Sequence, residues 1–198
     1  EESAVKRIML VSHLGAEPAS AYPLLKAKGI VEQMIINSPL QYSIIKTGPI
    51  FGERDHFLEK IQNYLKTLPL VYFLPDKGRT ILHPLWVKDL ISVMILSLDH
   101  SLTQNKTFSI GGPEYYALGE LFNLLKEYWK LRQVSFSIPS SYARLVLLFW
   151  QVLAKNTPIS SFDIDTVAFD RTAPIDNITK VFGILPYSLR DYLSQQRI

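Results

Sequence analysis

The sequence predicts an α/β fold built around a parallel β-sheet. Two runs of mainly apolar and β-branched residues, Val5–Ser12 and Tyr42–Lys46, are separated by a segment of helical length. A strand, a helix and a second strand in this spacing form a βαβ unit, and such units produce parallel sheets. Composition agrees with a packed core, because 47% of the 198 residues are hydrophobic and only 20% are charged.

The expected elements follow in order along the chain. The first helix should run from about Ala21 to Asn37, with Ser20 as its cap and Pro23 in its first turn. Further helices are expected at Asp55–Leu65, Val87–Leu98 and Leu118–Trp129, and short strands at Val71–Leu74, Thr80–His83, Thr107–Ile110 and Ser135–Ile138. The region Ile159–Ile198 should be irregular with short helices.

Composition excludes several classes of function. The chain has no cysteine, which rules out disulfides, Cys-ligated zinc, iron–sulfur clusters and thiol catalysis. No metal site is expected, since no HExxH spacing occurs. The formal net charge is +3 and no run of Lys and Arg is present, so nucleic-acid binding is not expected.

One apolar segment, Tyr142–Lys155, allows two interpretations. It is too short for a membrane-spanning helix, which needs about 20 apolar residues. A helix that is apolar nearly all round is usually buried in a core. The alternative is contact with a membrane surface or with a partner protein.

Three residues near the start of the chain suggest redox chemistry. Ser12 ends the first strand, and Tyr22 and Lys26 are four residues apart, which places them on one face of a helix. A cation beside a phenol lowers the pKa of the phenol, and a nearby hydroxyl can bond a substrate oxygen. The three would form a proton relay for carbonyl and alcohol chemistry. Alone, a Tyr–Lys pair is more often a packed ring and a solvated amine.

Five stretches, in order, carry a family resemblance: VSHLGA…SAYPLLKAKG, YSIIKTGPIFGERDHFLEKI, PLVYFLP, PLWVKDL and FSIGGPE. Together they resemble the extended and atypical short-chain dehydrogenases/reductases over at least residues 5–130. Within these, they look most like the NAD(P)H-binding branch related to the dehydrogenase-like accessory subunit of respiratory complex I. The resemblance implies a Rossmann-type parallel sheet followed by a C-terminal α/β and helical substrate-side region.

The resemblance also implies roles for individual residues. Ser12 would be the hydroxyl that orients substrate, Tyr22 the acid/base, and Lys26 its partner and a ligand of the nicotinamide ribose. The cofactor is NAD or NADP. The family's nicotinamide-side loop would be formed by Thr47, Gly48, Pro49 and Ile50.

Two departures leave a second alignment open. The family usually has Arg-Pro where this chain has Lys46–Thr47. A Glu often lies four residues after the active lysine, a position that Ile30 occupies in the first alignment. Pairing Lys28 with Glu32 restores that spacing but places Leu24 at the tyrosine position. We prefer the first alignment, because it needs no gap after the first strand.

The chain contains no GxGxxG or GxxGxxG motif. Dinucleotide binding needs such a turn so that the backbone can approach the pyrophosphate. We therefore expect the first, Gly-rich half of the fold to lie upstream of Glu1, and the isolated chain to bind NAD(P)H poorly. Residues 1–110 would be the C-terminal half of the nucleotide domain with interleaved substrate-side segments, and residues 111–198 the substrate-side region.

The function expected from the sequence is that of an NAD(P)-binding oxidoreductase or epimerase-like protein. It would transfer a hydride between nicotinamide and a carbonyl, alcohol or sugar-like small-molecule substrate. The alternative is a non-catalytic, nucleotide-stabilised subunit or assembly factor of a membrane complex. The expected location is cytoplasmic, with membrane or partner contact through Tyr142–Lys155.

Overall fold

The computed structural model describes residues 5–67, 70–99, 101–139 and 160–196, together with Tyr142 and Leu145. Apart from these two residues, the predicted helix Tyr142–Lys155 lies outside the described residues. The chain forms two compact units that alternate along the sequence: unit 1 is 1–52, 83–114 and 171–198, and unit 2 is 53–82 and 115–170. The functional division into 1–110 and 111–198 stays a prediction.

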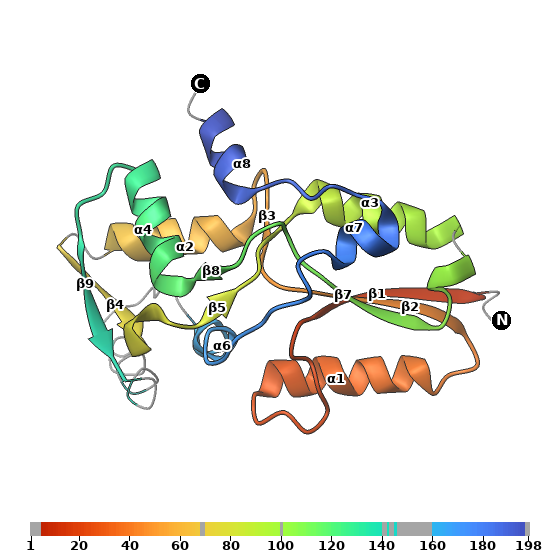
Figure 1. Ribbon diagram of the computed structural model, residues 1–198. Coiled ribbons are helices and arrows are strands. Elements are labelled where there is room, and N and C mark those ends of the chain that lie inside the picture. Colours follow the sequence, from red (N-terminus) through yellow and green to blue (C-terminus); the bar gives the residue numbers. More distant parts are fainter. Residues whose placement is uncertain are drawn as a thin grey trace. The chain divides into compact units, whose positions relative to one another are not determined.

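Unit 1 is built on a three-stranded parallel sheet in the order β1-β2-β7 (Figure 1). The strands are β1 (Arg7–His13), β2 (Gln41–Thr47) and β7 (Lys106–Ile110), and α1 (Pro23–Ile36) joins the first two. The α/β class, the βαβ unit and the parallel sheet predicted from the sequence are therefore confirmed.

Helix α1 begins later than the sequence suggested. Tyr22, with an extended backbone, is the residue before the first turn, and Pro23 lies in that turn as expected. The hydroxyl of Ser20 accepts the N–H of Tyr22 at 3.2 Å and does not cap the helix, so the predicted cap is wrong. The reason is Pro23, which forces the residue before it into an extended conformation.

Helices cover both faces of this sheet. Helix α1 lies on one face, and α3 (Val87–Asp99) and α7 (Asn177–Phe182) lie on the other (Figure 1). The core on the α3–α7 side is formed by buried apolar side chains from the strands and both helices: Ile45, Leu85, Leu90, Val93, Ile110 and Ile178. The unit is completed by β3 (Ile50–Phe51), which pairs with β6 (Leu85–Trp86), by the short helix η2 (Ser101–Thr103) and by α8 (Leu189–Gln195).

Unit 2 contains two small sheets and three α-helices among its described residues. Strands β4 (Val71–Pro75) and β9 (Val134–Ile138) form a parallel pair, and β5 (Ile81–Leu82) and β8 (Tyr116–Ala117) form an antiparallel pair. The helices are α2 (His56–Thr67), α4 (Leu118–Tyr128) and α6 (Ser161–Thr166), with η1 (Asp76–Gly78) after β4. Across both units, the helices and strands predicted outside 142–155 are confirmed, with ends within two residues of those expected.

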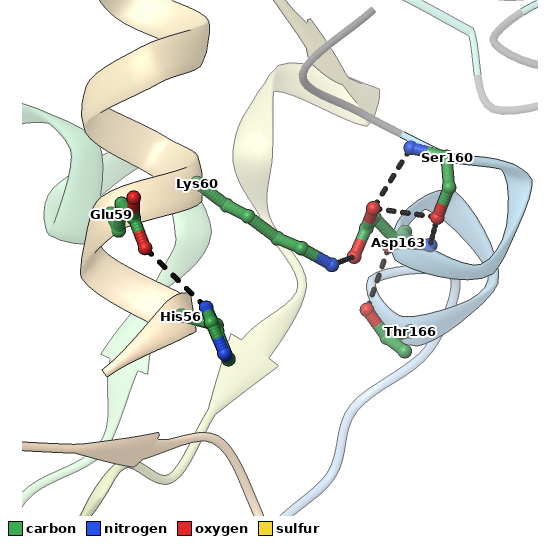
Figure 2. Close-up of polar contacts among 6 residues, drawn as sticks. All are labelled: His56, Glu59, Lys60, Ser160, Asp163 and Thr166. Atoms are coloured by element: carbon green, nitrogen blue, oxygen red, sulfur yellow. Dashed lines mark hydrogen bonds and ion pairs between the residues drawn. The ribbon is translucent and has the colours of Figure 1, made fainter. Parts of the chain in front are cut away.

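An ion pair joins α2 to α6 within unit 2 (Figure 2). Lys60 Nζ lies 2.8 Å from Asp163 Oδ1, and Asp163 also accepts the hydroxyl and the backbone N–H of Ser160 at 2.6 and 2.8 Å. Burial alone would raise the pKa of Asp163, but the hydrogen bonds from Lys60 and Ser160 outweigh it and lower the pKa. Asp163 therefore closes the N-terminus of α6 and fixes it to α2.

His83 connects three segments of unit 1. Its ring is fully buried, Nε2 lies 2.7 Å from the carbonyl oxygen of Gly112, and Nδ1 accepts the N–H of Ala173 at 3.2 Å. These partners require a neutral ring that carries its proton on Nε2. Gly111 permits the contact, because a Cβ there would lie 2.1 Å from His83 Nδ1.

We expect unit 1 to lose stability in mild acid. Burial lowers the pKa of His83 below its ordinary value of 6.5, although the hydrogen bond to Gly112 partly opposes this. Because the unfolded chain takes up the proton first, the stabilisation is present above pH 6.5 and is lost as the pH falls toward the lowered pKa. Urea unfolding at about pH 7.5 and about pH 5.5 should show this loss.

The variant His83→Gln should be less stable at neutral pH and should show a smaller loss in acid. His56→Gln is the matched control, because the His56 side chain is 91% exposed. An unchanged pH dependence in His83→Gln would assign the acid sensitivity to other groups, such as His13.

Candidate functional site

The carboxyl ends of β1, β2 and β7 lie at one edge of the unit 1 sheet. Ligands of open parallel sheets bind outside this edge. Ser12 and His13 end β1, Thr47 ends β2, and Gly111 follows β7. The predicted nicotinamide-side residues therefore lie at the edge where the fold places a ligand.

A buried polar network stands directly beneath this edge. The Ser12 hydroxyl donates to Glu32 Oε1, and Lys46 Nζ lies 2.9 Å from Glu32 Oε2. Ser12 and Lys46 are cross-strand partners on β1 and β2, and Glu32 reaches them from α1. Lys46 Nζ also donates to the carbonyl of Ala16 at 2.8 Å. The carboxylate of Glu32 thus bonds to both strands of the βαβ unit.

In the sequence, Glu32 stands out only by its spacing from Lys28, and Lys46 only as a departure from the family pattern. The structure pairs these two residues instead. One signal was available in the sequence: Lys46 is a charge that directly follows the apolar pair Ile44–Ile45 in a predicted strand. Such a charge needs a counter-ion when it is buried. The identity of that counter-ion depends on the β1–β2 register, which local sequence does not define.

Tyr22 and Lys26 lie at the start of α1. The backbone N–H of Lys26 donates to the carbonyl of Tyr22 at 2.9 Å, and the Lys26 side chain is exposed. Tyr22 has φ −94° and ψ 119°, so it precedes the helical conformation. The shared helical face inferred from the four-residue spacing therefore does not apply to its side chain. The proton relay of Ser12, Tyr22 and Lys26 stays a prediction.

Lys28 lies closer to the end of β1. It is half-buried, and its charge acts on His13. The pKa of His13 is lowered mainly by burial and further by the charges of Lys28 and Arg171, against a hydrogen bond to the Thr47 carbonyl that raises it. His13 Nδ1 lies 3.3 Å from that oxygen. A neutral imidazole with two cations nearby therefore stands at this edge of the sheet.

The predicted cofactor loop, residues 47–50, is held by backbone contacts. Thr47 is buried and its carbonyl accepts the N–H of Leu14 at 3.0 Å, while the carbonyl of Pro49 accepts the N–H of Leu85 at 2.9 Å. Gly48 is required for close packing, because a Cβ there would lie 2.5 Å from the carbonyl oxygen of His83. The assignment of Thr47, Gly48, Pro49 and Ile50 to cofactor contact stays a prediction.

The residues present fit only one end of a nicotinamide nucleotide. Lys28 and the strand ends bring a cation and hydrogen-bonding groups to the edge where open parallel sheets bind ligands. The sequence supplies no Gly-rich loop for the pyrophosphate, and Gly111–Gly112 are accounted for by packing on His83 and Pro84. In the described part of the chain, no three His, Asp or Glu residues are grouped so as to hold a metal ion.

The comparison with curated proteins links the chain to respiratory-enzyme subunits. It is 26% identical over 151 residues to the mitochondrial NADH dehydrogenase [ubiquinone] 1 alpha subcomplex subunit 9 of Arabidopsis thaliana, an alignment that covers 72% of this chain and 37% of that protein. The Mus musculus subunit of the same name is 30% identical over 128 residues, or 64% and 32% of the two chains. The chain thus spans about a third of the length of these relatives. No protein-family model matches it.

Solved structures with the same fold are oxidoreductases and epimerases by name. An NADPH-dependent quinone oxidoreductase of Escherichia coli, complexed with NADPH, superposes with a TM-score of 0.71 at 17% identity, covering 98% of this chain and 66% of that one. A nucleoside-diphosphate-sugar epimerase of Staphylococcus aureus gives 0.69 at 12% identity and covers 96% and 64%. At this level of identity, the likeness concerns the fold.

The Glu32 network predicts a specific pattern of stability changes. Lys46→Met leaves a buried carboxylate without its counter-ion and should lower the free energy of unfolding by about 3 kcal/mol. Adding Glu32→Gln should recover part of the loss, with a coupling energy of at least about 1 kcal/mol in a double-mutant cycle measured by urea unfolding. Lys106→Met, at an exposed position of β7, should change stability by less than about 0.5 kcal/mol. Additive effects of the two network substitutions would contradict the pairing.

The sequence comparison and the fold comparison both agree with the resemblance carried by the sequence motifs. The matched relatives are the accessory subunits that the sequence motifs resemble, and the matched folds are parallel α/β folds of the Rossmann type. The chain is similar in sequence to the alpha subcomplex subunit 9 of NADH dehydrogenase, and its parallel α/β fold is similar to the folds of the named oxidoreductase and epimerase.

Proposed function

We propose that the protein is a non-catalytic, nucleotide-holding accessory subunit of a membrane-associated respiratory complex. The observation that carries the proposal is the placement of Lys28 and Glu32 on α1. In the alignment that pairs Lys28 with Glu32, Lys28 occupies the position of the family's active lysine. Leu24 then occupies the position of the proton-donating tyrosine.

The choice between the two alignments supports this function. Of the two candidate lysines, only Lys28 is followed four residues later by a glutamate, and Glu32 is buried in the network with Ser12 and Lys46. Lys28 is half-buried and its charge acts on His13 at the end of β1, whereas Lys26 is exposed. These observations favour Lys28 as the family's site lysine.

The chemical consequence follows from the residue at the tyrosine position. Transfer of a hydride to a carbonyl requires a proton donor beside the forming alkoxide. Leu24 has no ionisable group, and the Ser12 hydroxyl donates to Glu32 and not toward a substrate. Bound NAD(P)H would supply a hydride, but these residues would only bind and orient it. A nucleotide that binds the folded state without reacting still stabilises that state by mass action.

The relatives supply the partner in this proposal. They are named as mitochondrial subunits of NADH dehydrogenase. We therefore extend the proposal to assembly with a respiratory complex in mitochondria, in place of the cytoplasmic location expected from the sequence. Contact through Tyr142–Lys155 remains part of it. The residues give no basis for choosing between NAD and NADP.

A second candidate is the oxidoreductase or epimerase expected from the sequence. In that function Tyr22 transfers the proton, Lys26 lowers the pKa of Tyr22, and Ser12 orients the substrate oxygen. Two observations favour it: Tyr22 and Lys26 lie together at the start of α1, and the structural neighbours are named as enzymes.

Binding and turnover separate the two functions. In the protein with its whole natural sequence, Lys28→Met should raise the Kd for NADH or NADPH about tenfold, because a charge-assisted hydrogen bond to the ribose is lost. The matched control Lys26→Met should bind as the unmodified protein does. Tyr22→Phe should change neither the Kd nor any nucleotide-dependent reduction of quinones or carbonyls. Thermal unfolding without nucleotide checks that each variant folds.

The opposite pattern would establish the enzyme. If Lys26→Met weakens nucleotide binding while Lys28→Met does not, the first alignment is correct. If Tyr22→Phe also abolishes a measurable turnover, the non-catalytic proposal is wrong.

A further inference from the structure

In the parallel pair β4–β9 of unit 2, strand β4 carries apolar residues on both of its faces. Tyr72 and Leu74 point into the core, where the Tyr72 ring stacks on Phe122 of α4 at 5.5 Å. The alternate residues point the other way, since successive side chains of a strand alternate. They form what we call the outer face: Val71, Phe73, Val134, Phe136 and Ile138.

Among the described residues, the outer face is partly exposed. Val134 is 62% exposed and Phe136 is 54% exposed. The rings of Phe73 and Phe136 lie 6.5 Å apart, so the two strands present one continuous apolar surface. Leu70, which is 77% exposed and accepts the N–H of Val134 through its carbonyl, lies beside it. Exposed apolar patches of this kind are typical of interaction sites.

The net positive charge of the chain is concentrated around this strand. The stretch 128–162, which contains β9, carries four Lys and Arg residues and no Asp or Glu, whereas the rest of the chain has 17 basic and 18 acidic residues. Lys130 and Arg132 precede β9 and are both exposed. One acidic residue follows β4 directly, Asp76, and it is accompanied by Lys77 and Arg79.

We propose that the outer face of β4–β9 binds peripherally to an anionic lipid membrane. The apolar side chains would enter the boundary between headgroups and acyl chains, and Lys130 and Arg132 would pair with anionic headgroups. The apolar face is complementary to the acyl chains of a bilayer, and the basic residues beside it are complementary to the anionic headgroups. The sequence that follows β9 has the same character, since the apolar run 145–150 begins directly after Arg144 and its continuation ends at Lys155.

The membrane contact is a surface contact. No helix in the described ranges is long and apolar enough to cross a bilayer. The proposal rests on unit 2 alone and does not depend on the nucleotide function argued for unit 1.

Vesicle sedimentation tests the proposal. The protein should sediment with vesicles of phosphatidylcholine and phosphatidylserine, and much less with phosphatidylcholine alone or at high salt. Lys130→Gln/Arg132→Gln should weaken binding about 25-fold, at about fivefold for each charge. Phe136→Ser should weaken it about tenfold through lost apolar burial. The matched controls Lys66→Gln and Ile95→Ser change an exposed cation of α2 and an exposed apolar residue of α3, and they should bind normally.

A labelling experiment identifies the occupant of the face. Because the chain has no cysteine, Val134→Cys provides a single thiol at the outer face and Ile95→Cys a control thiol elsewhere. A water-soluble maleimide should modify both in the absence of lipid, and anionic vesicles should protect only the thiol at position 134.

Three results would overturn the proposal. Equal binding to neutral vesicles would remove the role of the basic residues. Protection of the thiol at position 134 without lipid would mean that the chain itself or a second copy covers the face. Light scattering that shows a dimer abolished by Phe136→Ser, without vesicle binding, would identify the face as an interface between copies.

Discussion

The carboxylate of Glu32 is the interaction on which the geometry of unit 1 depends. It lies on the buried side of α1, together with Leu25 and Gly29, and an ionised carboxylate there is costly unless donors satisfy it. Ser12 and Lys46 supply one donor to each oxygen, and they come from the two strands that α1 connects. Hydrophobic packing holds α1 against the sheet but is not directional. The Glu32 network defines how far the helix is rotated about its axis.

That rotation determines which residues of α1 face the end of β1. Lys28 lies one turn before Glu32 and therefore on the same side of the helix, whereas Lys26, two residues earlier, lies on a different side. The observed exposures agree, with Lys26 exposed and Lys28 half-buried. Gly29 supports the same orientation, because a Cβ there would lie 2.2 Å from the backbone of Glu17. The helix can approach the turn after β1 this closely only with glycine at that position.

Much of the fold could be predicted because its helices and strands have clear periodicity. Strand β2 has a buried, β-branched centre at Ile44–Ile45, and α4 carries its buried residues at helical spacing. Strands β3, β6 and β8 have two residues each, too few for any pattern. Ser20 is a favourable cap by residue type, and the sequence therefore predicted a helix start at Ala21. The helix begins at Pro23 instead, because proline holds the preceding residue, Tyr22, in an extended conformation.

The candidate site was less predictable, because its contacts join distant segments. Glu32 and Lys46 meet only through the register of two parallel strands, and the neutral state of His83 depends on Gly112 and Ala173. Local spacing suggested a shared face for Tyr22 and Lys26, but one residue of that pair precedes the helix. A spacing rule for helices applies only where both residues are helical. Sequence patterns define the first residue of a helix less well than its interior.

Parallel sheets are normally covered on both faces. Unit 1 follows this rule, whereas the parallel pair of unit 2 departs from it among the described residues. In unit 1, α1 covers one face of the sheet and α3 with α7 covers the other (Figure 1). In unit 2, Tyr72 and Leu74 of β4 pack in the core, while the outer face of β4–β9 is apolar and partly exposed among the described residues. Strand β4 reads VYFLP, without the polar alternation of a strand that faces water. Its composition is that of a strand with apolar surroundings on both sides, whereas β9 reads VSFSI and places its apolar residues on the outer face alone. The surface that completes this layer must be apolar where it meets Phe73 and Phe136 and negatively charged where it meets Lys130 and Arg132.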